Sequence, residues 1–481
     1  MPFGIPSSPT LSRLLLAGAA ALLAGLVVPA SGHAIALNCL VPAGQTASSS
    51  QAPLRFGIFP GGAAGSVSAK AAPRPEHPAK RLAALRTLAG SSPFVVRLYD
   101  SWTGGAGDDD GGWLDREVAG YTAAGLQVEL VVRYTPAVAD AGSAPAAFAE
   151  HVRAIVSRYG RDPRFVSLQV TNEANLSGQP DASDGAFAGV ADAVVKGVVA
   201  AKDQVRRGGH GQLRIGFSWA YDERPLASTQ FWATLGRLGG RAFADSVDWV
   251  GLDSYPGTWA PQIALSNLLP GLASAAVTES VRSLRDCFMP LAGLGNRTSI
   301  HIAENGFPTG PGRSEELQAQ VLAAMVRGVD AIHARYGVTD YRWFDLRDSS
   351  SADPSIESQY GITRDDYSPK PAFATYRDLV AGDDGASAAA VAASGKCRRS
   401  PIKVSVPRWK GRRVTSLVVR VGNKVVKRAG GKVAKRARRS RIPRSVKISI
   451  RSGRAAVKLR LTAKSRGKRV HRVQRRTYRV C

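Results

Sequence analysis

Acidic side chains are absent from the end of the chain. Residues 396–481 contain 32 lysines and arginines and no aspartate or glutamate. Residues 1–395 hold the other 33 basic residues and all 37 acidic ones, which gives that part a net charge of −4. Because a strongly cationic region attracts polyanions and a balanced region does not, this asymmetry predicts two domains with separate partners.

Cysteine is also scarce, with four residues in 481. They are too dispersed to predict a metal cluster, and they allow three complete disulfide pairings. We favour Cys397–Cys481, because this pair brackets the basic segment and would close a long loop in a small domain. The pairing Cys39–Cys287 then follows by elimination.

Long hydrophobic runs are confined to the N-terminus. Leu14–Val28 is apolar, follows Arg13 and precedes small residues at 29–34. This pattern predicts a cleaved secretory signal peptide over residues 1–34, and the alternative is an uncleaved membrane anchor. No later segment is apolar enough to span a membrane. We therefore expect a secreted, extracellular protein, in which disulfides can form, and the cell wall is a further expected location.

Strand-like and helix-like segments alternate eight times over residues 54–381. The expected strands are 54–59, 94–99, 128–134, 165–173, 213–219, 247–255, 299–304 and 341–346. The expected helices are 79–88, 114–124, 146–159, 186–205, 231–237, 275–288, 315–336 and 369–380. Eight such units predict an α/β protein with a closed (β/α)8 TIM barrel. The alternative, a doubly wound open sheet, is less favoured because Pro60–Gly65 lacks the spacing of a phosphate-binding loop.

Segments of different composition flank this barrel. Residues 35–53 are predicted to be flexible, and residues 382–395 read as a linker. Five segments beyond the linker alternate apolar and polar residues with period two: 402–406, 416–421, 446–450, 456–461 and 477–480. They predict a small antiparallel β domain over residues 396–481, by default a β-sandwich.

The basic domain has only two aromatic residues, Trp409 and Tyr478. This composition disfavours both a base-stacking platform and an aromatic sugar-binding face. Secretion favours a cell-wall polyanion or acidic polysaccharide as its partner over nucleic acid, although phosphate contacts need only lysine and arginine. A solubilising or wall-associated appendage without a specific ligand is an equal alternative.

Two glutamates end two of the expected strands. Glu173 follows a strand-like run and Asn172, while Glu304 follows Ser299–Ala303 and precedes Gly306. A charge at the mouth of an apolar strand is costly unless it is paired or used. Since the carboxyl ends of barrel strands meet at one face, the two carboxylates are predicted to approach each other, as a retaining glycosidase requires.

This pattern resembles the clan A glycoside hydrolases, which are retaining, cellulase- and β-glycosidase-like enzymes on (β/α)8 barrels. In that clan an Asn-Glu pair ends the fourth strand and a glutamate ends the seventh, as Asn172–Glu173 and Glu304 do here. The resemblance covers residues 54–381. It implies that Glu173 is the general acid/base and Glu304 the nucleophile. A structural ion pair is the alternative for each.

The resemblance extends to substrate-binding residues at the ends of other strands. Arg97 and Tyr255 would stabilise ionised Glu304, and Asn172 would bind the sugar 2-hydroxyl. Trp343 would offer a flat face to a pyranose ring, with Trp219, Trp259 and Trp102 as further candidates at other strand ends or loops. An ion pair of Arg97 with another carboxylate, and plain packing of the aromatic rings, are the structural alternatives. His301 is expected to be a satisfied core histidine.

We therefore predict a secreted retaining β-glycosidase that hydrolyses a β-linked poly- or oligosaccharide, with water as second substrate and no cofactor or metal. One alternative is a glycan-binding barrel without catalysis. Another is a cell-wall- or polyanion-binding protein that acts through residues 396–481. The presence of both Glu173 and Glu304 favours the enzyme.

Overall fold

The computed structural model describes residues 52–62, 71–105, 112–137, 142–265 and 270–382, together with six strands between residues 402 and 480. The expected signal peptide, the flexible segment up to residue 51 and residues 383–395 of the linker lie outside the described residues. Among the helices that are described, none combines the length and hydropathy needed to cross a membrane.

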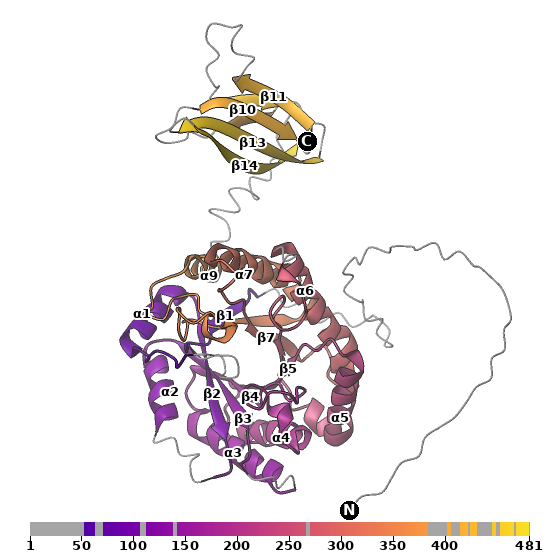
Figure 1. Ribbon diagram of the computed structural model, residues 1–481. Coiled ribbons are helices and arrows are strands. Elements are labelled where there is room, and N and C mark those ends of the chain that lie inside the picture. The colour runs from indigo at the N-terminus through magenta and orange to yellow at the C-terminus, as the bar shows by residue number, and fades with distance from the viewer. Residues whose placement is uncertain are drawn as a thin grey trace, which may run out of the picture. The chain divides into compact units, whose positions relative to one another are not determined.

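Eight parallel strands close into a barrel in sequence order, surrounded by helices (Figure 1). Strand β1 pairs with both β2 and β8, which closes the barrel. The predicted (β/α)8 barrel is therefore confirmed, and the open doubly wound sheet is wrong. The strands are β1 (Arg55–Ile58), β2 (Val95–Trp102), β3 (Gln127–Tyr134), β4 (Phe165–Val170), β5 (Arg214–Ala220), β6 (Trp249–Asp253), β7 (Ser299–Asn305) and β8 (Val338–Trp343).

The helices follow the expected order, with some different bounds. They are α1 (Pro78–Ala89), α2 (Trp113–Ala123), α3 (Ala144–Tyr159), α4 (Val190–Gly208), α5 (Pro225–Ala244), α6 (Pro270–Ser283), α7 (Glu315–Asp330), α8 (His333–Tyr336) and α9 (Pro371–Val380). Helix α5 is longer than the expected 231–237 and includes a non-helical residue, Gly240. The expected helix 315–336 is divided into α7 and α8.

Local sequence explains where α7 begins. The Ser314 side chain accepts a hydrogen bond from the Leu317 backbone amide at 3.1 Å, which satisfies one of the free amides of the first turn. Glu315 and Glu316 place negative charge at the same end, where the helix dipole favours it. Its buried face then packs against the barrel layer, as in the other surrounding helices.

The interior of the barrel holds a buried network of charges. Arg97 Nη1 donates to Glu129 at 2.8 Å, and Arg342 Nη2 donates to Glu129 at 3.1 Å and to Asp340 at 2.7 Å. His301 lies 3.1 Å from Asp340 and stacks on Trp249, so it is a core histidine, as predicted. Burial alone would raise the pKa of Glu129, but the cations around it hold that pKa well below its usual range.

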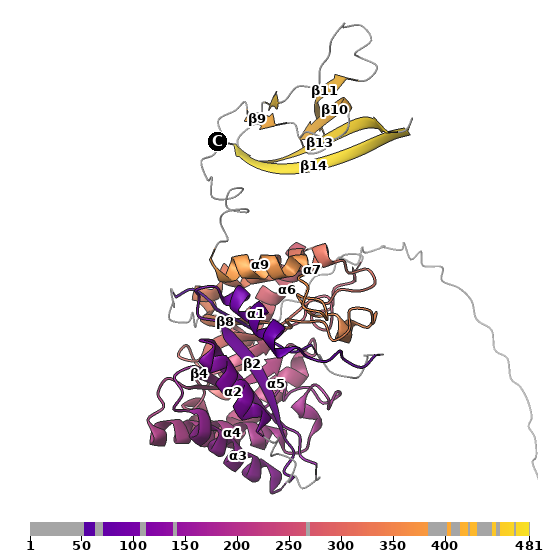
Figure 2. The same ribbon diagram turned by 90° about the vertical axis from the view of Figure 1, so that its left-hand side faces the viewer.

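The C-terminal part contains two antiparallel sheets (Figure 2). Its strands are β9 (Ile402–Ser405), β10 (Val414–Val421), β11 (Lys424–Gly430), β12 (Ser445–Ile448), β13 (Gly453–Ser465) and β14 (Lys468–Val480). Four of them form a sheet in the order β11-β10-β13-β14, and β12 pairs with β9. The antiparallel β structure is confirmed and the sandwich stays a prediction. Strand β11 was not expected, and β13 and β14 are longer than expected.

Cysteine chemistry is visible at one position of the barrel. Cys287 is disulfide-bonded. The other three cysteines, Cys39, Cys397 and Cys481, lie outside the described residues. Both pairings therefore stay predictions.

Candidate active site

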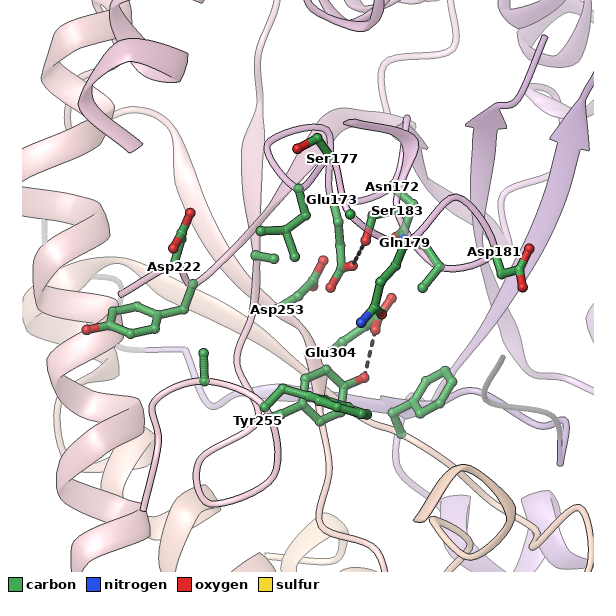
Figure 3. A pocket seen from close by; sticks show the side chains of 18 of the residues that line it. Asn172, Glu173, Ser177, Gln179, Asp181, Ser183, Asp222, Asp253, Tyr255 and Glu304 are labelled. Carbon is green, nitrogen blue, oxygen red and sulfur yellow. Dashed lines mark hydrogen bonds between the residues drawn. The ribbon is translucent and has the colours of Figure 1, made fainter. Parts of the chain in front are cut away.

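A cavity of about 730 Å³ lies at the carboxyl ends of the barrel strands (Figure 3). Residues at the ends of β2 to β8 line it, among them Tyr99, Glu173, Asp253, Glu304 and Phe344. In a (β/α)8 barrel this is the face at which active sites are built. Figure 3 shows that Glu173, Asp253 and Glu304 converge on one place in this cavity.

The Glu304 carboxylate is surrounded by donors. Tyr99 donates its hydroxyl hydrogen to Oε1 at 2.6 Å, and Tyr255 donates to Oε2 at 2.7 Å. Arg97 Nη2 adds a longer contact to Oε1 at 3.4 Å. Donors on both oxygens suit an ionised carboxylate, which can only accept hydrogen bonds. These donors hold Glu304, which lines the cavity, in position as an anion.

Glu173 has the opposite surroundings. Its side chain accepts one hydrogen bond, from the Ser183 hydroxyl to Oε2 at 2.5 Å. Burial, followed by the negative charge of Glu304, raises the pKa of Glu173 to about 8. The carboxyl group therefore keeps its proton at neutral pH. A neutral acid beside a fixed anion is the division of roles that a pair of catalytic carboxyls needs.

The backbone that presents Glu173 is strained. Thr171 and Glu173 have positive φ angles of 67° and 45°, which are uncommon for residues with a side chain. The Asp184 carboxylate accepts from the Asn172 amide at 2.8 Å, and the Ser218 hydroxyl accepts from the Glu173 amide at 3.0 Å. Such strain persists only where neighbouring groups hold the backbone, and it concentrates at functional sites.

The separation of the carboxyl groups matters for stereochemistry. One oxygen from each of Glu173, Asp253 and Glu304 can be chosen so that all three lie within 4.8 Å of one another. Retaining glycosidases hold their two carboxyls about 5–5.5 Å apart, whereas inverting ones need about 6.5 Å or more to admit a water molecule. The geometry suits direct attack by a carboxylate. These three are also a group, among the described residues, that could hold a metal ion.

The predicted site residues do not all reach the cavity. Asn172 and Tyr255 line it. Arg97 is fully buried and contacts the Glu304 carboxylate at 3.4 Å, as its predicted role of stabilising ionised Glu304 requires, but it does not line the cavity. Its main partner is Glu129 rather than a carboxylate at the barrel mouth. The Asn172 side-chain amide donates to the Ala182 carbonyl at 2.9 Å and so holds the loop after β4.

Two of the predicted tryptophan platforms, Trp219 and Trp343, are fully buried and lie outside the cavity lining. Trp219 packs against Trp232 and Phe288, with ring centroids 6.3 and 5.1 Å away. Phe344, the residue after Trp343, lines the cavity in place of Trp343. Successive residues of a strand point to opposite sides, so a prediction that is wrong by one position names a core residue in place of a cavity residue.

Sequence reasoning missed three residues at the site. Tyr99 and Asp253 each lie two positions from a predicted residue, Arg97 and Tyr255, and the period of a strand could have indicated them. Ser183 contacts Glu173 from the loop after β4. No local pattern signals a loop contact of that kind.

Comparisons with known proteins place the fold. No protein-family model matches the sequence, and no curated protein matches it. Similar solved structures include a GH5_18 protein from Bifidobacterium longum subsp. longum (15% identity, 70% of this chain and 80% of that chain, TM-score 0.49). Another is Bacteroides uniformis beta-glucuronidase 2, covalently bound to cyclophellitol-6-carboxylate aziridine (11% identity, 89% of this chain and 46% of that chain, TM-score 0.43). A third is a beta-D-glucuronidase of Dictyoglomus thermophilum (12% identity, 63% of this chain and 46% of that chain, TM-score 0.43).

These similar structures are glycoside hydrolases, and the resemblance concerns the barrel fold. This chain spans less than half the length of the two beta-glucuronidases. At these identities and TM-scores the likeness carries nothing about residues, substrate or mechanism. Conclusions about the site therefore rest on its own geometry.

Proposed function

We propose that the barrel is a retaining β-glycosidase that acts on a β-linked poly- or oligosaccharide. One observation carries the proposal: a fixed Glu304 carboxylate faces a proton-bearing Glu173 across less than 5 Å, at the carboxyl ends of the barrel strands. That pair supplies the nucleophile and the general acid of a double displacement. A glycan-binding barrel without catalysis would not require either group to be tuned in this way.

In the first step, one oxygen of Glu304 attacks the anomeric carbon. The bond from that carbon to the leaving oxygen breaks, and Glu173 gives its proton to this oxygen. Tyr99 and Tyr255 hold Glu304 in position for the attack. The products are a glycosyl ester of Glu304, the released alcohol and an ionised Glu173.

In the second step, Glu173 acts as the base. Esterification removes the negative charge of Glu304, which was one cause of the raised pKa of Glu173, so that pKa falls. Glu173 then takes a proton from water as the water oxygen attacks the anomeric carbon. The ester bond breaks, Glu304 leaves as a carboxylate, and the product has the configuration of the substrate.

Aromatic side chains other than Trp219 and Trp343 supply faces for the sugar, and one of them, Trp259, was among the predicted candidates. Phe344, Trp259 and Phe59 line the cavity, and Trp259 is also exposed. Apolar ring faces pack against the C–H face of a pyranose ring. We assign the sugar platform to these residues in place of Trp219 and Trp343, with Asn172 and Tyr255 as polar contacts.

The charge of the cavity favours a neutral sugar over a uronic acid. Its described lining includes seven carboxyl groups and two guanidinium groups. Both guanidinium groups already form ion pairs, Arg133 with Asp184 at 2.9 Å and Arg224 with Asp222 at 2.9 Å. An additional carboxylate on the substrate would meet mostly like charge, which costs several kcal/mol when it is uncompensated.

Hydrolysis of a substrate panel tests both the proposed retaining β-glycosidase activity and the preference for a neutral sugar. We expect release from neutral substrates among β-glucans, mannans, xylans, galactans and aryl β-glycosides. We expect an aryl β-glucuronide to be cleaved about 100-fold or more slowly, from the like-charge cost. Proton NMR should show the β-anomer as first product. Preference for the glucuronide would contradict only the inference that the cavity favours a neutral sugar. An inverted product, or no hydrolysis of any substrate, would contradict the proposed function.

We also propose that the C-terminal sheet binds a polyanion. Strand pairing places Arg420, Lys458 and Arg475 directly opposite one another on β10, β13 and β14. A part of the chain with so many basic residues and no acidic one attracts polyanions through its net charge. A secreted enzyme with such a row would be retained at an anionic cell wall. Extracellular location and wall association are thus part of this proposal.

Retention of the full chain on immobilised dextran sulfate tests the row of cations. Lys458→Glu should elute at lower salt than Lys427→Glu, because position 458 is in the row while position 427 pairs with Val419 instead. Both variants change the net charge equally. Equal elution would mean that total charge alone determines retention, and unchanged elution would exclude the sheet as the binding surface.

A further inference from the structure

A third carboxyl group, that of Asp253, lies at the carboxyl end of β6 beside the two glutamates (Figure 3). It lines the cavity but is only 2% exposed. Neither of its oxygens has a hydrogen-bond partner of normal geometry among the described residues. One of its oxygens lies no more than 4.8 Å from an oxygen of Glu173 and from one of Glu304.

Within the described part of the chain, Asp253 forms no ion pair, and the cation that acts on it, Arg97, makes its hydrogen bonds to other groups. The groups that act on it are Glu304 on β7, Glu173 after β4, Arg97 on β2 and the Ser218 hydroxyl on β5. The Arg97 guanidinium donates to Tyr99, Glu129, Gln169 and Glu304. An unpaired buried carboxylate next to another anion is prohibitively costly, so the group is neutral and carries a proton. Burial, followed by the negative charge of Glu304, raises the pKa of Asp253 well above the usual range, which agrees with a protonated group.

A protonated carboxyl differs from a carboxylate in what it can do. It has one hydroxyl donor, whereas a carboxylate has none. In the free enzyme, Glu173 is also protonated, and its neutral carboxyl oxygens accept this hydrogen bond more weakly than a carboxylate would. After the first step Glu173 is a carboxylate, and its Oε1 has no hydrogen-bond donor among the residues described. The terminal torsion of a carboxyl side chain is broad, so rotation can bring the two groups together without backbone movement.

We propose that Asp253 is a proton-bearing positioning residue that donates a hydrogen bond to Glu173 in the glycosyl-enzyme. The Ser183 hydroxyl holds one oxygen of the ionised Glu173, and Asp253 holds the other side of the carboxylate. The base of the second step is then fixed toward the incoming water. Asp253 keeps its proton throughout and neither forms nor breaks a bond to the sugar. The inference deepens the proposed function and rests on it.

Steady-state kinetics of two variants test this role. Asp253→Asn retains a donor of similar shape, so its kcat should stay within about threefold of the wild type. Asp253→Ala removes the donor and should slow the second step. With an activated aryl β-glycoside, for which the second step limits turnover, kcat and KM should fall together by about tenfold or more, while kcat/KM changes little. Misfolding would lower kcat without lowering KM.

A matched control lies at the other end of the same strand. Asp248 immediately precedes β6 and pairs with Lys202 at 2.7 Å, away from the cavity lining. Asp248→Ala should destabilise the protein without the joint fall of kcat and KM. If Asp253→Ala behaves like Asp248→Ala on an active enzyme, the positioning role is excluded while the glycosidase stands. If the wild type hydrolyses nothing, the proposed function fails instead.

Infrared difference spectroscopy tests the proton itself and needs no substrate. At neutral pH, the spectrum of Asp253→Asn should lose a band of protonated carboxyl C=O stretching relative to the wild type. Loss of a carboxylate band instead would show that Asp253 is ionised and would overturn the proposal. Activity that disappears with EDTA and returns with Ca²⁺ or Mn²⁺ would also overturn it, because the three carboxyls would then hold a cation.

Discussion

Glu304→Ala is expected to lower kcat by about four to six orders of magnitude, as loss of a nucleophile does in other enzymes of covalent mechanism. This loss corresponds to about 5–8 kcal/mol of the activation barrier. No neighbouring group can take over the attack, because Glu173 and Asp253 both carry protons and only Glu304 has donors on both oxygens. The measurement is kcat on an aryl β-glycoside that the wild type hydrolyses.

Two further variants separate chemistry from folding. Glu304→Gln retains the shape of the side chain and should be similarly inactive. Glu117→Ala on α2 breaks the ion pair with Arg81 on α1, and it should be nearly as active as the wild type because Glu117 lies outside the cavity lining. Sodium azide should partly restore Glu304→Ala and give the α-glycosyl azide, since the anion replaces the nucleophile. Activity of Glu304→Ala within tenfold of the wild type would exclude Glu304 as the nucleophile.

The sequence predicted the barrel and the two glutamates for a definite physical reason. Strands of a closed barrel are buried on both sides, as all six residues of Phe165–Val170 are, and a charge that follows such a strand marks the mouth. The family resemblance assigned Tyr255 correctly to the cavity. It assigned the wrong residue at β8, where Trp343 ends the strand fully buried and the next residue, Phe344, lines the cavity.

Other parts of the site depend on contacts between distant segments. Ser183 reaches Glu173 from a loop, and Asp184 in the same loop fixes the backbone at Asn172. Such contacts have no sequence period, so single-sequence reasoning could not have found them. Arg97 was assigned the correct neighbour, Glu304, but its position inside the barrel depends on Glu129, a partner on β3. Partner choice in a buried network follows from packing, not from either residue alone.

Glu173→Ala should have an effect that depends on the leaving group. For a sugar leaving group, which needs its oxygen protonated, kcat/KM should fall by about 10²- to 10⁴-fold, the usual contribution of general acid catalysis. For an activated aryl leaving group, kcat/KM should change far less, because that oxygen leaves as an anion. The second step still lacks its base, so the glycosyl-enzyme should accumulate with the aryl substrate. Azide should then restore turnover and give the β-glycosyl azide.

The pH profile ties this role to the site itself. The free wild-type enzyme needs Glu173 protonated, and its pKa is raised to about 8 by burial and by Glu304. The acid form therefore predominates below pH 8, and kcat/KM for a sugar leaving group should fall as the pH rises through about 8. Glu173→Gln cannot titrate and should lack this limb. A basic limb near the usual glutamate pKa of about 4.3 would mean that Glu173 is ionised at neutral pH. A proton donor would then have to be sought elsewhere in the cavity, first at Asp253, whose proton is held by the same two causes.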